Sequence, residues 1–379
     1  MKDNECDFIN SKINTIGFIG FGLIGGSIAR AIKSIYPKTL VYAYNYHKNP
    51  PSGDLKEALS DGILDHVTDN LTEGFSDCDI IFLCAPVLAN ILYLAKLKPI
   101  IKPSCIITDV GSVKGNIHEA VYELGMEEVF IGGHPMTGSE KTGYSNSYAI
   151  LLENAYYILT PTDKTPSEKL NTLNKLVKII GSIPIILGPY EHDEITAAIS
   201  HLPHIIAAQL VNLIRESDDD SEIMKQLAAG GFKDITRIAS SSPEMWQNIC
   251  LTNSKVIKSI LDRYINALQL ASDALLQMNG DYLYQMFDRA GEYRNSIPNK
   301  SLGLIHRIFE IYLDVIDETG AIASIASLLA DNQISIKNIG IIHNREFQEG
   351  VLHIEFYDES SEEAAKALLT KHNYHIYDR

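Results

Sequence analysis

Short apolar runs alternate with helical patterns along the first half of the chain. The runs follow one another in the order INTIGFIG, TLVYAY, DIIFLCAP, CIITDV, FIGG and AYYILT. Strands that are apolar throughout are typical of sheets covered on both faces, and the helical segments between these runs supply the cover. The pattern predicts an α/β domain, built on a doubly wound parallel sheet, over residues 13–187.

After about Gly188 the apolar residues follow helical spacing without an intervening strand run. The segments are ITAAISHLPHIIAAQLVNLI, EMWQNICLTNSKVIKSILDRYINALQLASDALL and DYLYQMFDRAGEY. Apolar residues recurring at this spacing indicate amphipathic helices. An all-helical domain is therefore predicted over residues 188–300.

From about Arg307 the pattern changes again and predicts a third domain over residues 307–379. It reads strand (IFEIYLDVID), helix (GAIASIASLLADN), strand (SIKNIGIIH), strand (GVLHIEFY), helix (SEEAAKALLTKH) and strand (YHIYD). This β-α-β-β-α-β order is that of a ferredoxin-like α+β domain.

Composition and charge narrow the functional classes. The chain has 379 residues, 45% of them hydrophobic, which is enough for two or three cores. Its net charge of -16 argues against nucleic acid as a partner, because that affinity depends on clustered Lys and Arg. Five scattered cysteines without a C-x-x-C pair fit a reducing cytoplasm. No signal peptide and no membrane span are expected, since no continuous apolar stretch reaches about 18 residues.

A glycine-rich motif connects the first strand run to a helix. Its residues are Gly20-Phe21-Gly22-Leu23-Ile24-Gly25. In the G-x-G-x-x-G pattern the first glycine allows a tight turn, the second lets a pyrophosphate approach the backbone, and the third lets helix and strand pack closely. The helix N-terminus attracts the phosphate charge. With a strand before it and a helix after it, the motif predicts a Rossmann-type dinucleotide site at Gly20, Gly22, Leu23, Ile24 and Gly25; the alternative is glycines in an ordinary turn.

The residue that would contact the cofactor ribose is not the usual carboxylate. About 20 residues past the last glycine, where an acidic residue is typical, the chain has Tyr44-Asn45-Tyr46-His47-Lys48. Asn45 can hydrogen-bond a ribose hydroxyl, whereas His47 and Lys48 can tolerate a 2′-phosphate. NAD is therefore favoured over NADP, and the alternative is that this segment is only the end of a strand.

Two polar side chains follow neighbouring strand runs. Ser112 lies in DVGSVK and His134 in GGHPMTGSE. Ligands of open α/β sheets bind at the carboxyl ends of the strands, so both side chains are expected to face the cofactor crevice. Histidine, with a pKa near 6.5, can accept a hydroxyl proton at neutral pH. His134 is the predicted catalytic base, and the alternative is a turn or core histidine.

The helical region contains further polar clusters. His201 and His204 have a spacing that supplies half of a metal site, but no third ligand stands at a suitable distance, so no metal is expected. We expect them to line an interdomain cleft instead. Arg237 follows Asp234 by one turn and precedes Trp246. An arginine fork binds a carboxylate, and an aspartate can orient it; the alternative is a surface ion pair.

Five motifs together resemble those of prephenate dehydrogenases. In sequence order they are GFIGFGLIGGSIA, TDVGSVK, GGHPMTGSE, SHLPH and GGFKDITRIA. The resemblance covers essentially the whole chain, because the family has a Rossmann domain, a helical dimerisation domain and, in many bacterial members, a C-terminal ACT domain. It implies a homodimer that converts prephenate to 4-hydroxyphenylpyruvate and CO2 with reduction of NAD, in L-tyrosine biosynthesis.

The resemblance also implies roles for individual residues. His134 would accept the proton of the prephenate ring hydroxyl, and Ser112 would hydrogen-bond the same hydroxyl. Arg237 would hold a substrate carboxylate with support from Asp234. Further positions match residues that line or gate the family's pocket: Glu140, His192, His204 and Trp246. Because Asn45 stands where a carboxylate is usual, the choice between NAD and NADP stays open. Because some relatives prefer arogenate, the choice between prephenate and arogenate stays open as well.

The resemblance suggests a regulatory role for the C-terminal domain. ACT domains pair through their sheets and bind an amino acid between their first strand and first helix, which here includes Asp317, Gly320 and Ile322. Asn338 is expected on the neighbouring strand. L-tyrosine, the product of the pathway, is the expected effector, and the alternative is a purely structural dimerisation module.

Two rival functions fit the sequence less well. A β-hydroxyacid or ketol-acid dehydrogenase would carry a catalytic lysine on the helix where this chain has His201 and His204. In a nucleotide-sensing regulator without catalytic activity, His134, Ser112 and Arg237 would have no function.

Overall fold

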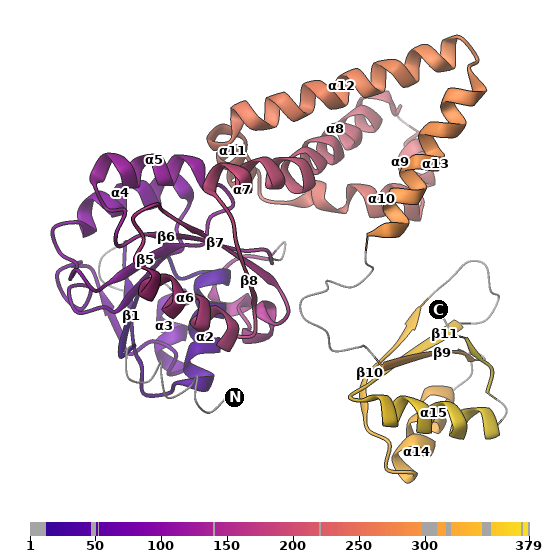
Figure 1. The fold of residues 1–379 in the computed structure, drawn as a ribbon. Coiled ribbons are helices and arrows are strands. Elements are labelled where there is room, and N and C mark those ends of the chain that lie inside the picture. The colour runs from indigo at the N-terminus through magenta and orange to yellow at the C-terminus, as the bar shows by residue number, and fades with distance from the viewer. Residues whose placement is uncertain are drawn as a thin grey trace. The chain divides into compact units, whose positions relative to one another are not determined.

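The computed structural model divides the chain into two compact units, Met1–Gly303 and Leu304–Arg379. The described residues are 13–46, 51, 53–138, 141–219, 221–297, 309–315, 320–342, 350–372 and 374–377. Figure 1 shows the elements of each unit.

The first unit begins with a five-stranded parallel sheet, as predicted. Its strands are β1 (Thr15–Ile19), β2 (Leu40–Tyr44), β3 (His66–Thr68), β4 (Ile80–Leu83) and β5 (Ile106–Asp109). Their order is β3-β2-β1-β4-β5. Because the chain proceeds from β1 to one side and later returns to place β4 on the other, a crevice opens at the carboxyl ends of β1 and β4.

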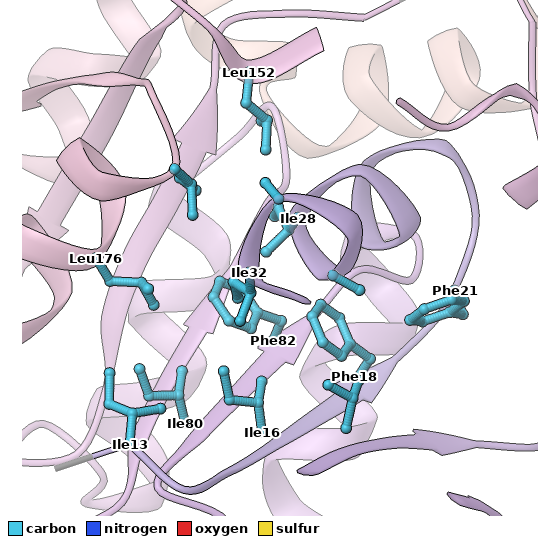
Figure 2. Packing of buried hydrophobic residues seen from close by; sticks show 14 of the residues in the cluster. Ile13, Ile16, Phe18, Phe21, Ile28, Ile32, Ile80, Phe82, Leu152 and Leu176 are labelled. Carbon is cyan, nitrogen blue, oxygen red and sulfur yellow. The ribbon is translucent and has the colours of Figure 1, made fainter. Parts of the chain in front are cut away.

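Helices cover both faces of this sheet. Alternate residues of the central strands face opposite sides, so Phe18 and Phe82 pack together on one face, with ring centroids 5.1 Å apart. On that face they meet Ile28 and Ile32 of α2 (Leu23–Ile35) and Leu176 of α6 (Ser167–Ile179), as Figure 2 shows. The other face is covered by α4 (Val87–Leu97) and α5 (Gly115–Leu124). The remaining helix of this region is α3 (Gly53–Ser60).

The prediction of parallel strands throughout is wrong for the last part of this domain. Strands β6 (Ile131–Pro135), β7 (Tyr156–Pro161) and β8 (Ile183–Ile186) form a separate three-stranded sheet, in which β6 and β7 are antiparallel. A parallel pair needs a long crossover, usually a helix. The described residues between β6 and β7 contain short 3-10 turns, Tyr144–Asn146 and Ala149–Leu152, but no such helix. A bridge between Ile107 and Phe130 connects the two sheets.

The described residues of the first unit that follow β8 form helices, as predicted (Figure 1). Helix α7 (Pro189–Thr196) continues through a π-helical turn (Ala197–His201) into α8 (Leu202–Ser217). Pro203 follows this turn; a proline ring cannot fit against the carbonyl four residues back, which favours local widening. The later helices are α9 (Ile223–Leu227), α10 (Gly230–Thr236), α11 (Pro243–Thr252), α12 (Ser254–Leu276) and α13 (Gly280–Ser296).

The second unit has the predicted ferredoxin-like order. Its elements are β9 (Phe309–Val315), α14 (Ala321–Asp331), β10 (Ile336–Ile342), β11 (Gly350–Phe356), α15 (Glu359–Lys371) and β12 (Ile376–Tyr377). The antiparallel sheet has the order β10-β11-β9-β12. Both helices pack on one face, where Ile311 and Ile354 meet Ile325 and Leu369.

This strand order corrects one expectation about the C-terminal domain. Asn338 lies on β10, and β11 separates β10 from β9. Asn338 is therefore not on the strand next to the first strand of its own domain, because the antiparallel hairpin β10-β11 inserts β11 between them. Gly320 lies at the N-terminus of α14 with a φ of 95°. Asp317 lies outside the described residues.

Candidate active site

The glycine-rich turn has the geometry that a dinucleotide site requires. Gly20 has a φ of +89°, and a Cβ there would lie 2.6 Å from the main-chain nitrogen of Ala85. At Gly25 a Cβ would lie 2.8 Å from the oxygen of Gly20, so helix and strand pack without room for a side chain. Gly22, in contrast, has open space around its Cα. The open side of the turn is therefore where a ligand can approach.

The first turn of α2 can hold an anion. Leu23 and Ile24 open the helix, and Gly22, its N-cap, supplies no side chain to cap the exposed N–H groups. The first turn carries no acidic residue either. Main-chain N–H groups with the positive end of a helix dipole suit the pyrophosphate of a dinucleotide.

Asn45 lies at the carboxyl end of β2, next to this crevice. Its main-chain N–H donates to the oxygen of Thr68 over 2.7 Å, and the residue is 2% exposed. The amide is thus in the place where a ribose-binding residue is expected. His47 and Lys48 lie outside the described residues.

His134 on β6 begins a chain of hydrogen bonds that crosses into the helical region. Its Nδ1 lies 2.7 Å from Nε2 of His192, and Nδ1 of His192 lies 2.8 Å from Oδ1 of Asp193. The carboxylate of Asp193 accepts from the main-chain N–H groups of Lys114 and Gly115, each over 2.7 Å. These bonds join β6, α7 and the start of α5.

Burial sets the charge state of these histidines. It lowers the pKa of His134 well below its usual range, and the nearby His192 and Lys114 lower it further. Burial also lowers the pKa of His192, although the hydrogen bond to Asp193 opposes the change. Both rings are therefore neutral at neutral pH. Nε2 of His134 makes no hydrogen bond to any described residue, so this nitrogen can accept a proton.

A buried ion pair fixes the loops around the base. Lys114 and Asp109 are fully buried and bonded to each other, and Nζ of Lys114 also donates to the oxygen of Gly133 over 2.8 Å. The N–H groups of Gly111 and Gly133 donate to the Asp109 carboxylate over 2.9 Å and 3.1 Å. The pair therefore ties the end of β5 to β6. Sequence reasoning did not assign a role to either residue of the pair.

Ser112 lies in the loop that this ion pair organises, between β5 and α5. The residue is half-buried, and its hydroxyl makes no hydrogen bond to any described residue. Ser112 follows the end of β5 and His134 lies near the end of β6, which the bridge between Ile107 and Phe130 places beside β5. The hydroxyl is thus available to a ligand.

Aromatic rings form a second group in the helical region. The ring of His204 stacks on Trp246 at 3.7 Å, and the ring of His201 meets the edge of the same indole at 6.0 Å. Nδ1 of His204 donates to the oxygen of Ser200 over 2.8 Å. Nε1 of Trp246 and Nε2 of His201 are buried polar atoms without a hydrogen-bond partner in the described part of the chain. Such orphaned groups are suited to a bound polar ligand.

Electrostatics connect this group with Arg237 and His134. After burial, the charge of Arg237 contributes to the lowered pKa of His204, so the guanidinium lies near that ring. His201 likewise contributes to the lowered pKa of His134. Arg237 is exposed just past α10, and Asp234 is exposed on the same helix. Glu140 lies outside the described residues.

Comparisons with known proteins agree with this arrangement. Residues 28–185 match the family model of the prephenate dehydrogenase nucleotide-binding domain, and residues 188–289 match that of the prephenate dehydrogenase dimerisation domain. A prephenate dehydrogenase from Bacillus subtilis is 37% identical over 94% of this chain and 96% of its own length. The chain belongs to the prephenate dehydrogenase family.

Solved structures of this family match the first unit. Prephenate dehydrogenase from A. aeolicus, crystallised with hydroxyphenyl propionate and NAD+, has a TM-score of 0.70 at 30% identity and covers 75% of this chain and 98% of its own. Arogenate dehydrogenase from Synechocystis has a TM-score of 0.65 at 29% identity, with 74% of this chain and 99% of its own covered. The chain is thus an oxidoreductase of this family with a nucleotide-binding domain and a dimerisation domain, and the two rival functions no longer apply.

Among the described residues, the helical run Pro189–Ser217 is long and apolar enough to cross a membrane, by length and composition only. It lies within the residues that match the dimerisation domain. Its apolar residues are therefore those of a helix within that dimerisation domain.

Proposed function

We propose that this protein oxidatively decarboxylates prephenate to 4-hydroxyphenylpyruvate and CO2 with reduction of NAD, in L-tyrosine biosynthesis. The observation that carries the proposal is His134, a neutral histidine with an available Nε2, which lies at the same end of the parallel strands as the open glycine-rich turn. The Bacillus subtilis relative bears the name of this activity.

The residues suit the chemistry of this reaction. Nε2 of His134 takes the proton of the C4 hydroxyl, and Ser112 hydrogen-bonds the same oxygen. NAD, when bound at the glycine-rich turn, would accept the hydride that leaves C4. The electrons of the bond to the ring carboxylate then enter the ring as CO2 leaves, and His134 returns the proton to the new phenolic oxygen. Aromatisation drives the reaction, so the protein chiefly positions the ring and manages one proton.

Cofactor binding is assigned to the glycine-rich turn and to Asn45. Gly20, Gly22 and Gly25 shape the turn, and the N–H groups of Leu23 and Ile24 face the phosphates. The amide of Asn45 holds the ribose, which favours NAD over NADP. The NAD+ in the crystal structure of the A. aeolicus relative supports this choice.

Substrate binding is assigned to the helical region. Arg237 holds a carboxylate of prephenate through charge-assisted hydrogen bonds, and Asp234 supports it. His204 and Trp246 are assigned to the wall of the pocket and His192 to the support of His134. Glu140 keeps its predicted role at the pocket. The stacking of His204 on Trp246 and the nearby charge of Arg237 support a common pocket.

Arogenate is the second candidate substrate, because the Synechocystis relative is an arogenate dehydrogenase. Steady-state assays with prephenate and arogenate, each with NAD and NADP, distinguish the candidates. We expect the highest kcat/KM for prephenate with NAD. A preference for arogenate would replace the proposed substrate, and a preference for NADP would show that His47 and Lys48 decide the cofactor.

Assembly, location and regulation complete the proposal. We assign the protein to the cytoplasm as a homodimer, and the dimerisation-domain match supports the assembly. L-tyrosine is the proposed effector at the ACT domain, held by Asp317, Gly320 and Ile322. A Cβ at Gly320 would meet open space, so a ligand can approach the start of α14.

A further inference from the structure

His192 uses both of its ring nitrogens inside the protein. The side chain is fully buried, Nδ1 is bonded to Asp193, and Nε2 is bonded to His134. No ring nitrogen remains to contact a substrate directly. Any effect of His192 on the reaction must therefore pass through His134.

The positions of the hydrogens along this series of hydrogen bonds follow from the charge of Asp193, at its buried end. The Asp193 carboxylate is 4% exposed and already accepts two main-chain N–H groups at the N-terminus of α5. Such a place favours a carboxylate that carries no proton. The hydrogen between the two side chains therefore belongs to Nδ1 of His192, which donates to Asp193.

The position of the hydrogen between His192 and His134 follows in the same way. A neutral His192 with its hydrogen on Nδ1 has a lone pair on Nε2, and this lone pair can only accept. Nδ1 of His134 must therefore carry the hydrogen of the 2.7 Å bond to His192. A neutral His134 then has its own lone pair on Nε2.

We propose that His192 and Asp193 are positioning residues that hold His134 in the tautomer with its hydrogen on Nδ1 and its lone pair on Nε2. The inference rests on the proposed function, in which Nε2 receives the proton of the substrate hydroxyl. When His134 becomes an imidazolium, its Nδ1–H still donates to His192, and the Asp193 charge at the end of the chain stabilises the cation.

Two variants of His192 separate this role from simple packing. In His192→Gln, the side-chain oxygen can accept from His134 and the amide can donate to Asp193. In His192→Met, the side chain fills a similar volume but cannot accept the His134 hydrogen. Asp193 itself is a poorer choice for substitution, because its loss would also release the N-terminus of α5.

The measurement is the ¹⁵N resonance pattern of the full-length protein labelled in histidine, with His134 assigned by its absence in His134→Asn. We expect the parent and His192→Gln to show the hydrogen of His134 on Nδ1, and His192→Met to show Nε2–H or a mixture. In turnover, His192→Met should lose about 10- to 100-fold in kcat, as expected for a lost supporting residue, with KM within about threefold. His192→Gln should recover at least tenfold of that loss.

Several results would overturn the inference. They are a hydrogen on Nε2 of His134 in the parent, an unchanged tautomer in His192→Met, and equal losses in both variants. The tautomer readout needs no substrate, so it is independent of the proposed function. A correct tautomer in a protein that does not turn over prephenate would reject the function alone, whereas turnover with the wrong tautomer would reject only the positioning role.

Discussion

His134 combines a low pKa with an available Nε2. A base in this state is ready to accept a proton over the whole neutral range, since no proton must first be removed from it. The residues that create this state, His192 and Lys114 among them, come from other elements. The properties of the residue therefore depend on its surroundings more than on its type.

Replacing His134 by asparagine should leave the fold intact and lower kcat by about 10²- to 10⁴-fold, the share of a general base. Steady-state assays with prephenate and NAD measure the loss, and thermal unfolding checks the fold. His372→Asn, at an exposed position in the second unit, is a matched control that should keep parental turnover. A His134→Asn enzyme within a few-fold of the parent would reject the assignment.

Buried histidines also make stability depend on pH. Burial lowers the pKa of His118 and of His201 to about 4, whereas unfolded histidine titrates near pH 6.5. The unfolded state thus binds protons more tightly between these values. The contribution of each neutral buried histidine to the free energy of unfolding is therefore complete above about pH 6.5. It is lost as the pH falls towards 4, at up to about 1.4 kcal/mol per pH unit for each residue.

Urea unfolding at pH 7.5, 6, 5 and 4.5 tests this dependence in the parent and in His118→Gln. We expect the free energy of unfolding to fall less steeply with decreasing pH in the variant, because one titrating group is gone. His372→Gln, a substitution at an exposed position, is the matched control. If His118→Gln keeps the parental slope, His118 does not titrate below its usual range.

At the scale of elements, the turn between β1 and α2 serves two purposes through different glycines. Gly25 maintains the packing of helix on strand, where a Cβ would lie 2.8 Å from the oxygen of Gly20. Gly22 faces open space, where the structure itself would tolerate a methyl group. Folding and cofactor binding can therefore be separated within one motif.

The two glycines form a matched pair for an experiment. Gly22→Ala should keep the melting temperature within about 2 °C of the parent but weaken NAD binding at least tenfold, since a methyl group blocks the approach of the pyrophosphate. Gly25→Ala should lower the melting temperature, because the methyl group meets main-chain and side-chain atoms. Isothermal titration with NAD and calorimetry measure both effects. Unchanged NAD affinity in Gly22→Ala would argue against a phosphate site at this turn.

At the scale of the whole molecule, the helical region exposes large apolar side chains in the single chain. On α12 and α13 these include Leu268, Leu275, Leu276 and Phe287. Large apolar side chains left exposed on two helices that contact each other are typical of an interaction site. It agrees with the dimerisation-domain match over residues 188–289.

The proposed inhibition by L-tyrosine is also a property of the whole molecule. If L-tyrosine binds the ACT domain and favours an arrangement that takes up prephenate less well, inhibition should be lost in a chain that ends near Lys300. Prephenate turnover against added L-tyrosine, in the full chain and in the shortened one, measures this. A shortened chain with parental turnover but undiminished inhibition would place tyrosine in the active site instead.

The sequence by itself determined the local features of this protein. The glycine-rich turn, the apolar strands of the first sheet, the all-helical region and the β-α-β-β-α-β order of the second unit were all predicted. Each depends on residues close together in the chain, whose periodicity and turn chemistry carry the structural signal. His134 was singled out for the same reason, because in the sequence it comes after an apolar run and between glycines.

Only the tertiary structure decided which of these elements meet. The antiparallel pairing of β6 with β7 and the position of β11 between β9 and β10 depend on contacts between distant segments. So does the bond between His134 and His192, which are 58 residues apart. Periodicity reports which face of an element is apolar, but not which partner covers it. The buried Asp109–Lys114 pair and the chain from His134 to Asp193 were therefore visible only once the strands and helices had been placed together in space.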